Sequence, residues 1–291
     1  MIAQTAFTLI NPQTKALAFH IYDFEDDSYF EKLKNFNYYS MILVSAGRGK
    51  FQADLADYSF EHNSLLCFSI YQPFMIRAEG EFKGILINFH PDFFCIHKHQ
   101  EEVACNGVLF NNIYETPAIR LEDAEMSTLM AFADSLKTEM QNPALAQFEL
   151  LIAYLKIFLI NASRFKINQH SVREYGNEKE PFILKTLKDA IEEHFKTKHS
   201  PSEYADLLNI STKALNRISK THFNKTLTSL IAERVIIEAK RELYLTSKSV
   251  KAIAYELGFN DEFYFSRFFK NNAAVSPQVY RDTVGFAKGT A

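Results

Sequence analysis

The sequence has few cysteines and no long apolar segment. Cys67, Cys95 and Cys105 are an odd number and form no CxxC pair, which argues against a disulfide framework. The most apolar helical stretch, residues 148–160, is only 13 residues long and contains two charged side chains, so it is unsuited to spanning a bilayer. The first residues also lack a basic and apolar leader. We therefore expect a cytoplasmic protein with no membrane partner.

Motifs typical of common enzymes are missing as well. The sequence contains no Ser-His-Asp arrangement, no glycine-rich phosphate loop and no paired-carboxylate motif. We therefore expect no catalytic residue, no cofactor and no enzymatic activity.

The chain as a whole lacks the positive charge expected of a nucleic-acid-binding protein, because its formal net charge is −3. That average conceals an asymmetry. Residues 1–180 contain 15 Lys and Arg against 23 Asp and Glu, whereas residues 181–291 contain 17 against 12. A chain of 291 residues is long enough for two domains, and this distribution indicates that only the C-terminal one meets DNA.

Short strand-like segments follow one another from Ala16 to Phe89. In one of them Phe51 and Ala53 alternate with polar neighbours, as on a strand with one buried face. Glycines such as those of Gly47-Arg48-Gly49 separate the segments, and we expect turns there. The pattern predicts an antiparallel β-barrel or sandwich over residues 1–118.

After Pro117 the spacing of apolar residues becomes helical. We expect residues 119–165 to form a helical pair that flanks the barrel, and such a pair can also build a dimer interface. Residues 166–181 carry little apolar surface and include Gly176 and Pro181, which predicts a linker.

Two segments of the C-terminal region, residues 204–220 and 253–270, resemble each other. Corresponding positions hold Ala205 and Ala254, Leu208 and Leu257, Leu215 and Phe265, and Arg217 and Arg267. A small residue where two helices cross, an apolar corner and an apolar inner face on the second helix are requirements of a helix-turn-helix. The repeat therefore predicts two helix-turn-helix units in an all-α domain over residues 182–285.

Helix-capping signals agree with this layout. Residues 200–203 read Ser-Pro-Ser-Glu, a capping box with proline at the first helical position. Residues suited to capping the ends of later helices are Ser211, Asn224, Asp261 or Asn260, and Ser276. Residues 226–245 are predicted to form one long helix that joins the two units.

The exposed faces of the two second helices are the candidate DNA-binding surface. Its predicted members are Ser211, Thr212, Lys213, Asn216, Arg217 and Lys220 in the first unit, and Asn260, Glu262, Phe263, Tyr264, Arg267 and Lys270 in the second. Both arginines can fork onto guanine, and Asn216 can pair with adenine. The two lysines suit phosphates. The aromatic pair can contact thymine methyls or simply pack, and Arg267 has a buried ion pair as its alternative role.

With these features the C-terminal region resembles the AraC/XylS family of transcription regulators. The resemblance rests on IAYELGF and YFSRFFK within residues 253–270 and on the closing Ser-Pro-Gln-Val-Tyr-Arg of residues 276–281. It implies that both recognition helices enter successive major grooves of promoter DNA. Ser219 departs from the family pattern, which usually has Phe there, and Phe223 is a candidate to fill the gap.

The N-terminal segment is similar, much more weakly, to the cupin-like sensor domains that precede such DNA-binding domains. That resemblance implies a small-molecule effector in the barrel, for which His20, Arg77 and His90 are candidate ligands. Residues 88–106 also contain His90, His97 and His99, but no tetrahedral set has zinc-site spacing, so we expect no metal.

The expected architecture is thus α+β with two domains, a cupin-like barrel with flanking helices followed by the double helix-turn-helix. The expected function is sequence-specific, effector-responsive transcription regulation, as an activator or a repressor. The partners would be double-stranded DNA, a second copy of the chain and RNA polymerase. Two alternatives remain open: a metal-dependent cupin enzyme fused to a DNA-binding domain, and a regulator whose N-terminal half only dimerises.

Overall fold

A computed structural model describes residues 7–11, 15–54, 56–103, 105–175 and 182–284. The chain divides into two compact units, one of residues 1–112 with 116–172, the other of residues 113–115 with 173–291. The first unit is a sheet with helices and the second is helical, so the expected two-domain α+β architecture is confirmed.

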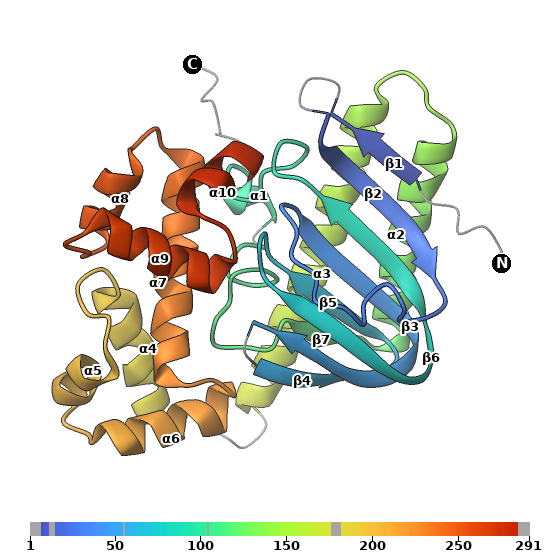
Figure 1. The fold of residues 1–291 in the computed structure, drawn as a ribbon. Coiled ribbons are helices and arrows are strands. Elements are labelled where there is room, and N and C mark those ends of the chain that lie inside the picture. Colours follow the sequence, from blue (N-terminus) through green and yellow to red (C-terminus); the bar gives the residue numbers. More distant parts are fainter. Residues whose placement is uncertain (1–6, 12–14, 55, 104, 176–181, 285–291) are drawn as a thin grey trace. The chain divides into compact units, whose positions relative to one another are not determined.

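The first unit is built on one antiparallel sheet (Figure 1). Its strands are β1 (Phe7–Ile10), β2 (Leu17–Phe24), β3 (Tyr39–Ala53), β4 (Ala56–Phe60), β5 (Ser64–Phe68), β6 (Phe74–Phe89) and β7 (Ala118–Arg120). They are hydrogen-bonded in the order β1-β2-β6-β3-β5-β7, with β4 also paired to β3. In the described part of the chain this path does not return to β1, so the sheet is open and the expected closed barrel is not formed.

Two expected strands are one strand in the structure. Gly47-Arg48-Gly49, predicted to be a turn, lies inside β3, where the pairing with β6 shifts register between Val44 and Ala46 and again between Gly47 and Gly49. Gly47 has φ +109°, and a Cβ there would lie 2.2 Å from the backbone oxygen of Glu81. Gly47 therefore permits a bulge that bends two long paired strands, and the chain does not reverse direction there.

The sheet has two apolar faces. One carries a core that is largely aromatic and includes Phe24, Phe30, Phe51, Phe60, Phe68, Phe74 and Phe82. Alternate residues point the other way, and Met41, Leu43, Ile85 and Ile87 are buried on that opposite face. The helices α2 (Asp123–Gln141) and α3 (Gln147–Tyr175) run along one face of the sheet in Figure 1. None of their side chains whose burial is described belongs to the aromatic core, so these helices cover the opposite face.

The predicted linker begins too early. Helix α3 continues through Tyr175, and Lys166 is buried, with its ammonium group 3.4 Å from the backbone oxygen of Thr116. No glycine or proline occurs between Gln147 and Tyr175, so nothing in the sequence ends the helix. Residues 176–181, the rest of the predicted linker, lie outside the described residues.

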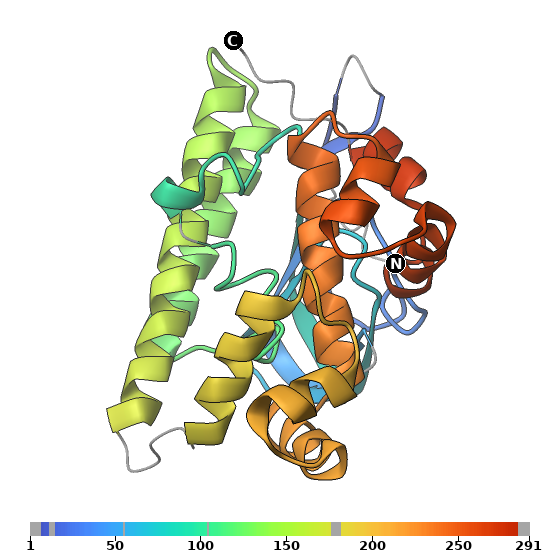
Figure 2. The ribbon, with the colours of Figure 1, turned by 90° about the vertical axis from the view of Figure 1, so that its left-hand side faces the viewer.

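The second unit is helical. Its elements are α4 (Phe182–His194), α5 (Pro201–Leu208), α6 (Thr212–Phe223), α7 (Leu227–Leu245), α8 (Val250–Glu256), α9 (Glu262–Ala273) and α10 (Pro277–Val284); the short α1 (Gln100–Val103) belongs to the first unit. Helix α7 packs against α4, α6, α8, α9 and α10. Both views show α6 at one end of α7 and the α8–α9 pair toward the other (Figure 2).

Candidate nucleic-acid interface

The predicted caps place the start of each candidate recognition helix. The Ser211 hydroxyl accepts the Ala214 N–H at 3.3 Å and begins α6, and the Asp261 carboxylate accepts the N–H groups of Phe263 and Tyr264 and begins α9. Asn224 ends α6 in the left-handed conformation with φ 57°. These cap predictions are confirmed, and Ser211 is thereby engaged by its own helix, which leaves it less available to read a base.

The capping box at the start of α5 is also confirmed. Ser200 donates its backbone N–H to Glu203 Oε2 at 2.9 Å and its hydroxyl to the same oxygen at 2.7 Å. These hydrogen bonds hold the pKa of the Glu203 carboxyl below its usual value. Helix α5 packs on α6, and α8 packs on α9, so each candidate recognition helix rests on a shorter partner.

Helix α6 presents a basic face. Lys213, Arg217 and Lys220 are exposed, and their spacing of four and three residues puts them on one side of the helix. The helix contains no acidic residue to neutralise them. On the opposite side Leu215 is fully buried in the core of the unit. Burial of Leu215 therefore fixes the orientation of α6 in which the basic face points to solvent.

Helix α9 presents the corresponding face. Phe263, Arg267 and Lys270 are exposed with the same spacing. The Phe263 side chain is 71% exposed and that of Tyr264 is 56% exposed, which is unusual for large aromatic residues. Phe265 and Phe269 are buried on the inner side. Arg267 is thus on the surface, and its alternative role as a buried ion-pair partner is wrong.

The other candidates are less available. Asn216 is half-buried, and its side-chain oxygen accepts the N–H of Leu227 at 3.2 Å, so it ties α6 to the start of α7. Thr212 and Glu262 are half-buried, and Asn260 is exposed. The role of Asn216 at the corner was not visible in the sequence because the bond depends on the packing of two helices.

Two conspicuous sequence features have structural explanations. The Ser219 hydroxyl donates to the backbone oxygen of Lys225 at 2.7 Å, so this buried serine is hydrogen-bonded, and Phe223 is buried in the core of the unit. In the closing motif, Arg281 donates to the backbone oxygens of Leu243, Thr246 and Lys248, which caps the C-terminal end of α7.

The structure separates the three candidate effector ligands in the first unit. His20 lies on β2 opposite Asn88, and His90 directly follows β6 and is buried. Arg77 lies near the other end of β6. His20 is half-buried, and burial lowers its pKa. His20 and His90 are therefore at one end of the sheet, and Arg77 is at the other.

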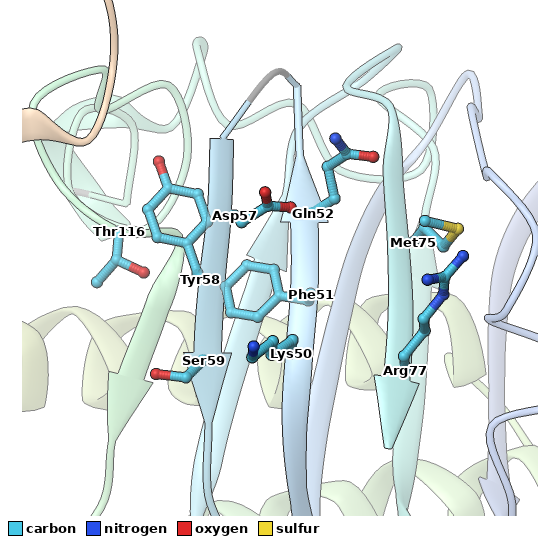
Figure 3. A pocket seen from close by; sticks show the side chains of 9 residues that line it. All are labelled: Lys50, Phe51, Gln52, Asp57, Tyr58, Ser59, Met75, Arg77 and Thr116. Atoms are coloured by element: carbon cyan, nitrogen blue, oxygen red, sulfur yellow. The ribbon is translucent and has the colours of Figure 1, made fainter. Parts of the chain in front are cut away.

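Arg77 borders an open pocket of about 670 Å³ on β3, β4 and β6 (Figure 3). Phe51 and Tyr58 stack there with ring centroids 5.2 Å apart. Lys50 pairs directly with Arg77 across β3 and β6. The remaining lining residues are Gln52, Asp57, Ser59, Met75 and Thr116.

Within the described ranges, no three His, Cys, Asp or Glu side chains are grouped so that they could hold a metal ion. The histidines of residues 88–106 make other contacts: His99 bonds Glu102 at 2.8 Å, and His90 lies 3.5 Å from Asp92. In the same ranges, no helix has both the length and the apolar character needed to cross a membrane.

Comparison with known proteins gives matches concentrated in the second unit. A model of the helix-turn-helix domain family matches residues 204–283. The raffinose operon transcriptional regulatory protein RafR of Pediococcus pentosaceus is 32% identical over 95 residues, 33% of this chain and 34% of RafR. The HTH-type transcriptional activator RhaS of an Enterobacter species is 27% identical over 157 residues, 54% of this chain and 53% of RhaS.

Among solved structures, ToxT of Vibrio cholerae aligns over 94% of this chain and 99% of its own length, at 16% identity and a TM-score of 0.41. The alignments with RafR and RhaS cover only 34% and 53% of those proteins. The family match spans most of α5 through α10, the part of the chain that carries both basic faces.

Proposed function

We propose that this chain, whose residues 204–283 match a helix-turn-helix domain family, is a sequence-specific DNA-binding transcription regulator of the AraC type. The observation that carries the proposal is the matched pair of outward faces on α6 and α9. Each has an arginine and a lysine at the same spacing, and each is fixed by burial of the opposite side of its helix.

In this proposal α5–α6 and α8–α9 are two helix-turn-helix units, and α6 and α9 are their recognition helices. Helix α7 has 19 residues and is therefore about 28 Å long. One turn of B-DNA is about 34 Å. Because α7 is nearly as long as one turn of DNA, it supports binding of α6 and α9 in successive major grooves on one side of the duplex.

The side chains divide into two roles. Arg217 and Arg267 read bases, because a guanidinium can donate two parallel hydrogen bonds to guanine O6 and N7. Lys213, Lys220 and Lys270 meet phosphates and set the register without reading sequence. Phe263 and Tyr264 contribute apolar contact to thymine methyls. Their high exposure supports this role, since large aromatic side chains are seldom left in solvent.

The first unit acts in this proposal as a sensor and dimerisation module. Its open antiparallel sheet with an aromatic core supports the sensor role, and the ToxT likeness is too weak to add to it. On α3, Leu150 and Ile157 are 40% and 39% exposed and seven residues apart, so they lie on one side of the helix. This exposed apolar side of α3 supports a homodimer. Two copies would present four recognition helices to a promoter that RNA polymerase also binds.

Selection of duplexes from a randomised pool by the full chain tests the proposal. We expect enrichment of a motif with two elements about 10 base pairs apart. Affinity for that motif should fall with added salt, because bound lysines and arginines release counterions from the phosphates. Arg217→Ala should weaken selection, whereas Arg241→Ala, a matched change of an exposed arginine on α7, should not. Equal affinity for every duplex would contradict the proposal.

A further inference from the structure

Three polar side chains form a row across the first unit's sheet. His20 on β2 pairs with Asn88 on β6, and Asn88 pairs with Ser40 on β3. Residues that are directly opposite in antiparallel strands point to the same face of the sheet. The next row on that face is Tyr22, Leu86 and Ile42, all members of the aromatic core. The polar row therefore lies on the interior face, beside the core.

The two inner members of this row are buried without hydrogen-bond partners. Asn88 and Ser40 are each 1% exposed. Within the described structure neither the nitrogen nor the oxygen of the Asn88 amide has a partner, and the Ser40 hydroxyl has none. Buried polar groups are almost always hydrogen-bonded, because leaving them unpaired forfeits their hydration. Three such atoms on neighbouring residues are free to hydrogen-bond a bound molecule.

Exposure changes steadily along the row. Thr8, which pairs with His20 on the outer side, is exposed, His20 is half-buried, and Asn88 and Ser40 are buried. The His20 ring lies beside the Tyr22 ring, with centroids 4.9 Å apart. Exposure thus falls along the row from β1 to the unpaired atoms, and the aromatic ring of Tyr22 lies beside the half-buried member of the row.

We propose that Asn88 and Ser40 are the polar floor of a binding site for a small uncharged ligand that carries hydroxyl or amide groups. The inference rests on the proposed function, in which this unit senses an effector. An amide offers one acceptor and two donors, and a serine hydroxyl offers both, so the floor complements groups that donate and accept. No member of the row carries a fixed charge, and an ionic ligand buried there would lose its hydration without a counter-charge.

The neutral state of His20 fits the same chemistry. Burial lowers the pKa of its imidazole and so favours the neutral form, which offers one donor and one acceptor. Arg77 and the open pocket at the far end of β6 take no part in this site.

Thermal unfolding of the full chain tests the site in two ways. Asn88→Leu replaces the amide by an apolar group of similar shape, so without ligand the melting temperature should rise by about 2–4 °C. The probes are D-galactose and myo-inositol, with D-galacturonate as the charged counterpart of galactose. At least one neutral probe should raise the melting temperature of the wild type, galacturonate should not, and Asn88→Leu should abolish the response.

Ser64→Ala is the matched control, since Ser64 is a buried serine on β5 that pairs with Val44, two interior rows from Ser40. It should keep the response to the neutral probe. A lower melting temperature for Asn88→Leu would show a structural amide and overturn the proposal. So would a response that persists in Asn88→Leu, or the failure of both neutral probes. Binding of the wild type to its selected duplex tests the DNA-binding function separately.

Discussion

Substitution of Phe263 distinguishes the role of α9 in DNA binding from its role in folding. Its side chain is 71% exposed, whereas Phe265, two residues along the same helix, is fully buried. Removing an exposed side chain typically changes the free energy of unfolding by at most about 0.5 kcal/mol. Removing a buried Phe costs about 3–5 kcal/mol. We therefore expect Phe263→Ala to unfold at the wild-type urea concentration and Phe265→Ala to unfold much earlier, as measured by circular dichroism of the full chain.

DNA affinity should show the reverse sensitivity for Phe263. Full burial of a Phe side chain contributes about 1.5–3 kcal/mol, so its loss is expected to weaken Kd by about 10- to 150-fold. Fluorescence anisotropy on the selected duplex measures this loss. The same titration on a duplex with deoxyuridine in place of thymidine removes only the methyl group, so the penalty of Phe263→Ala should shrink on the duplex that lacks the contacted methyl. Unchanged affinity, or a loss of stability comparable to that of Phe265→Ala, would refute the reasoning.

Three further predictions concern the second unit. Arg217→Ala should weaken binding about 5- to 150-fold and relax the preference at one base pair. Lys220→Ala should lower affinity evenly across sequences and reduce the slope of log affinity against log salt concentration by about one unit. Binding titrations on operator variants measure both, and identical effects of the two changes would contradict the prediction. Arg281→Met should lower the free energy of unfolding by about 1–3 kcal/mol, because three backbone oxygens at the end of α7 lose their donor; an unchanged urea midpoint would count against that capping role. Burial lowers the pKa of His199 from 6.5, so the unfolded chain binds the proton more readily and the free energy of unfolding should decline as pH falls below about 6.5. His199→Gln should flatten that decline in urea titrations from pH 7.5 to 5.5. An equally steep decline in the variant would argue against the prediction.

The second unit was largely predictable because its signals are local. Ser200 with Glu203, Ser211 and Asp261 each act within one helical turn, and all cap where the sequence predicts. The exposure of Arg217 and Arg267 followed from helical spacing around buried neighbours. The bond from Asn216 to the start of α7 was missed because it joins helices whose packing the sequence pattern does not fix.

The first unit was less predictable because its geometry depends on distant pairing. Gly47 was interpreted as part of a turn, since a bulge and a turn have the same local sequence signal, and only the partner strand distinguishes them. Arg77 and His90 are both near strand residues in the sequence, yet the length of β6 places them at opposite ends. The polar row of Asn88 and Ser40 requires the register of three strands.

In the proposed function, α6 and α9 bind neighbouring turns of one duplex at the same time. Its most direct test inserts five base pairs between the two elements of the selected duplex, which moves one element to the opposite side of the DNA at about 10.5 base pairs per turn. Because α7 holds both helices in one unit, neither can follow the displaced element. We expect affinity to fall to that of a duplex with a single element. Unchanged affinity after the insertion would contradict the account.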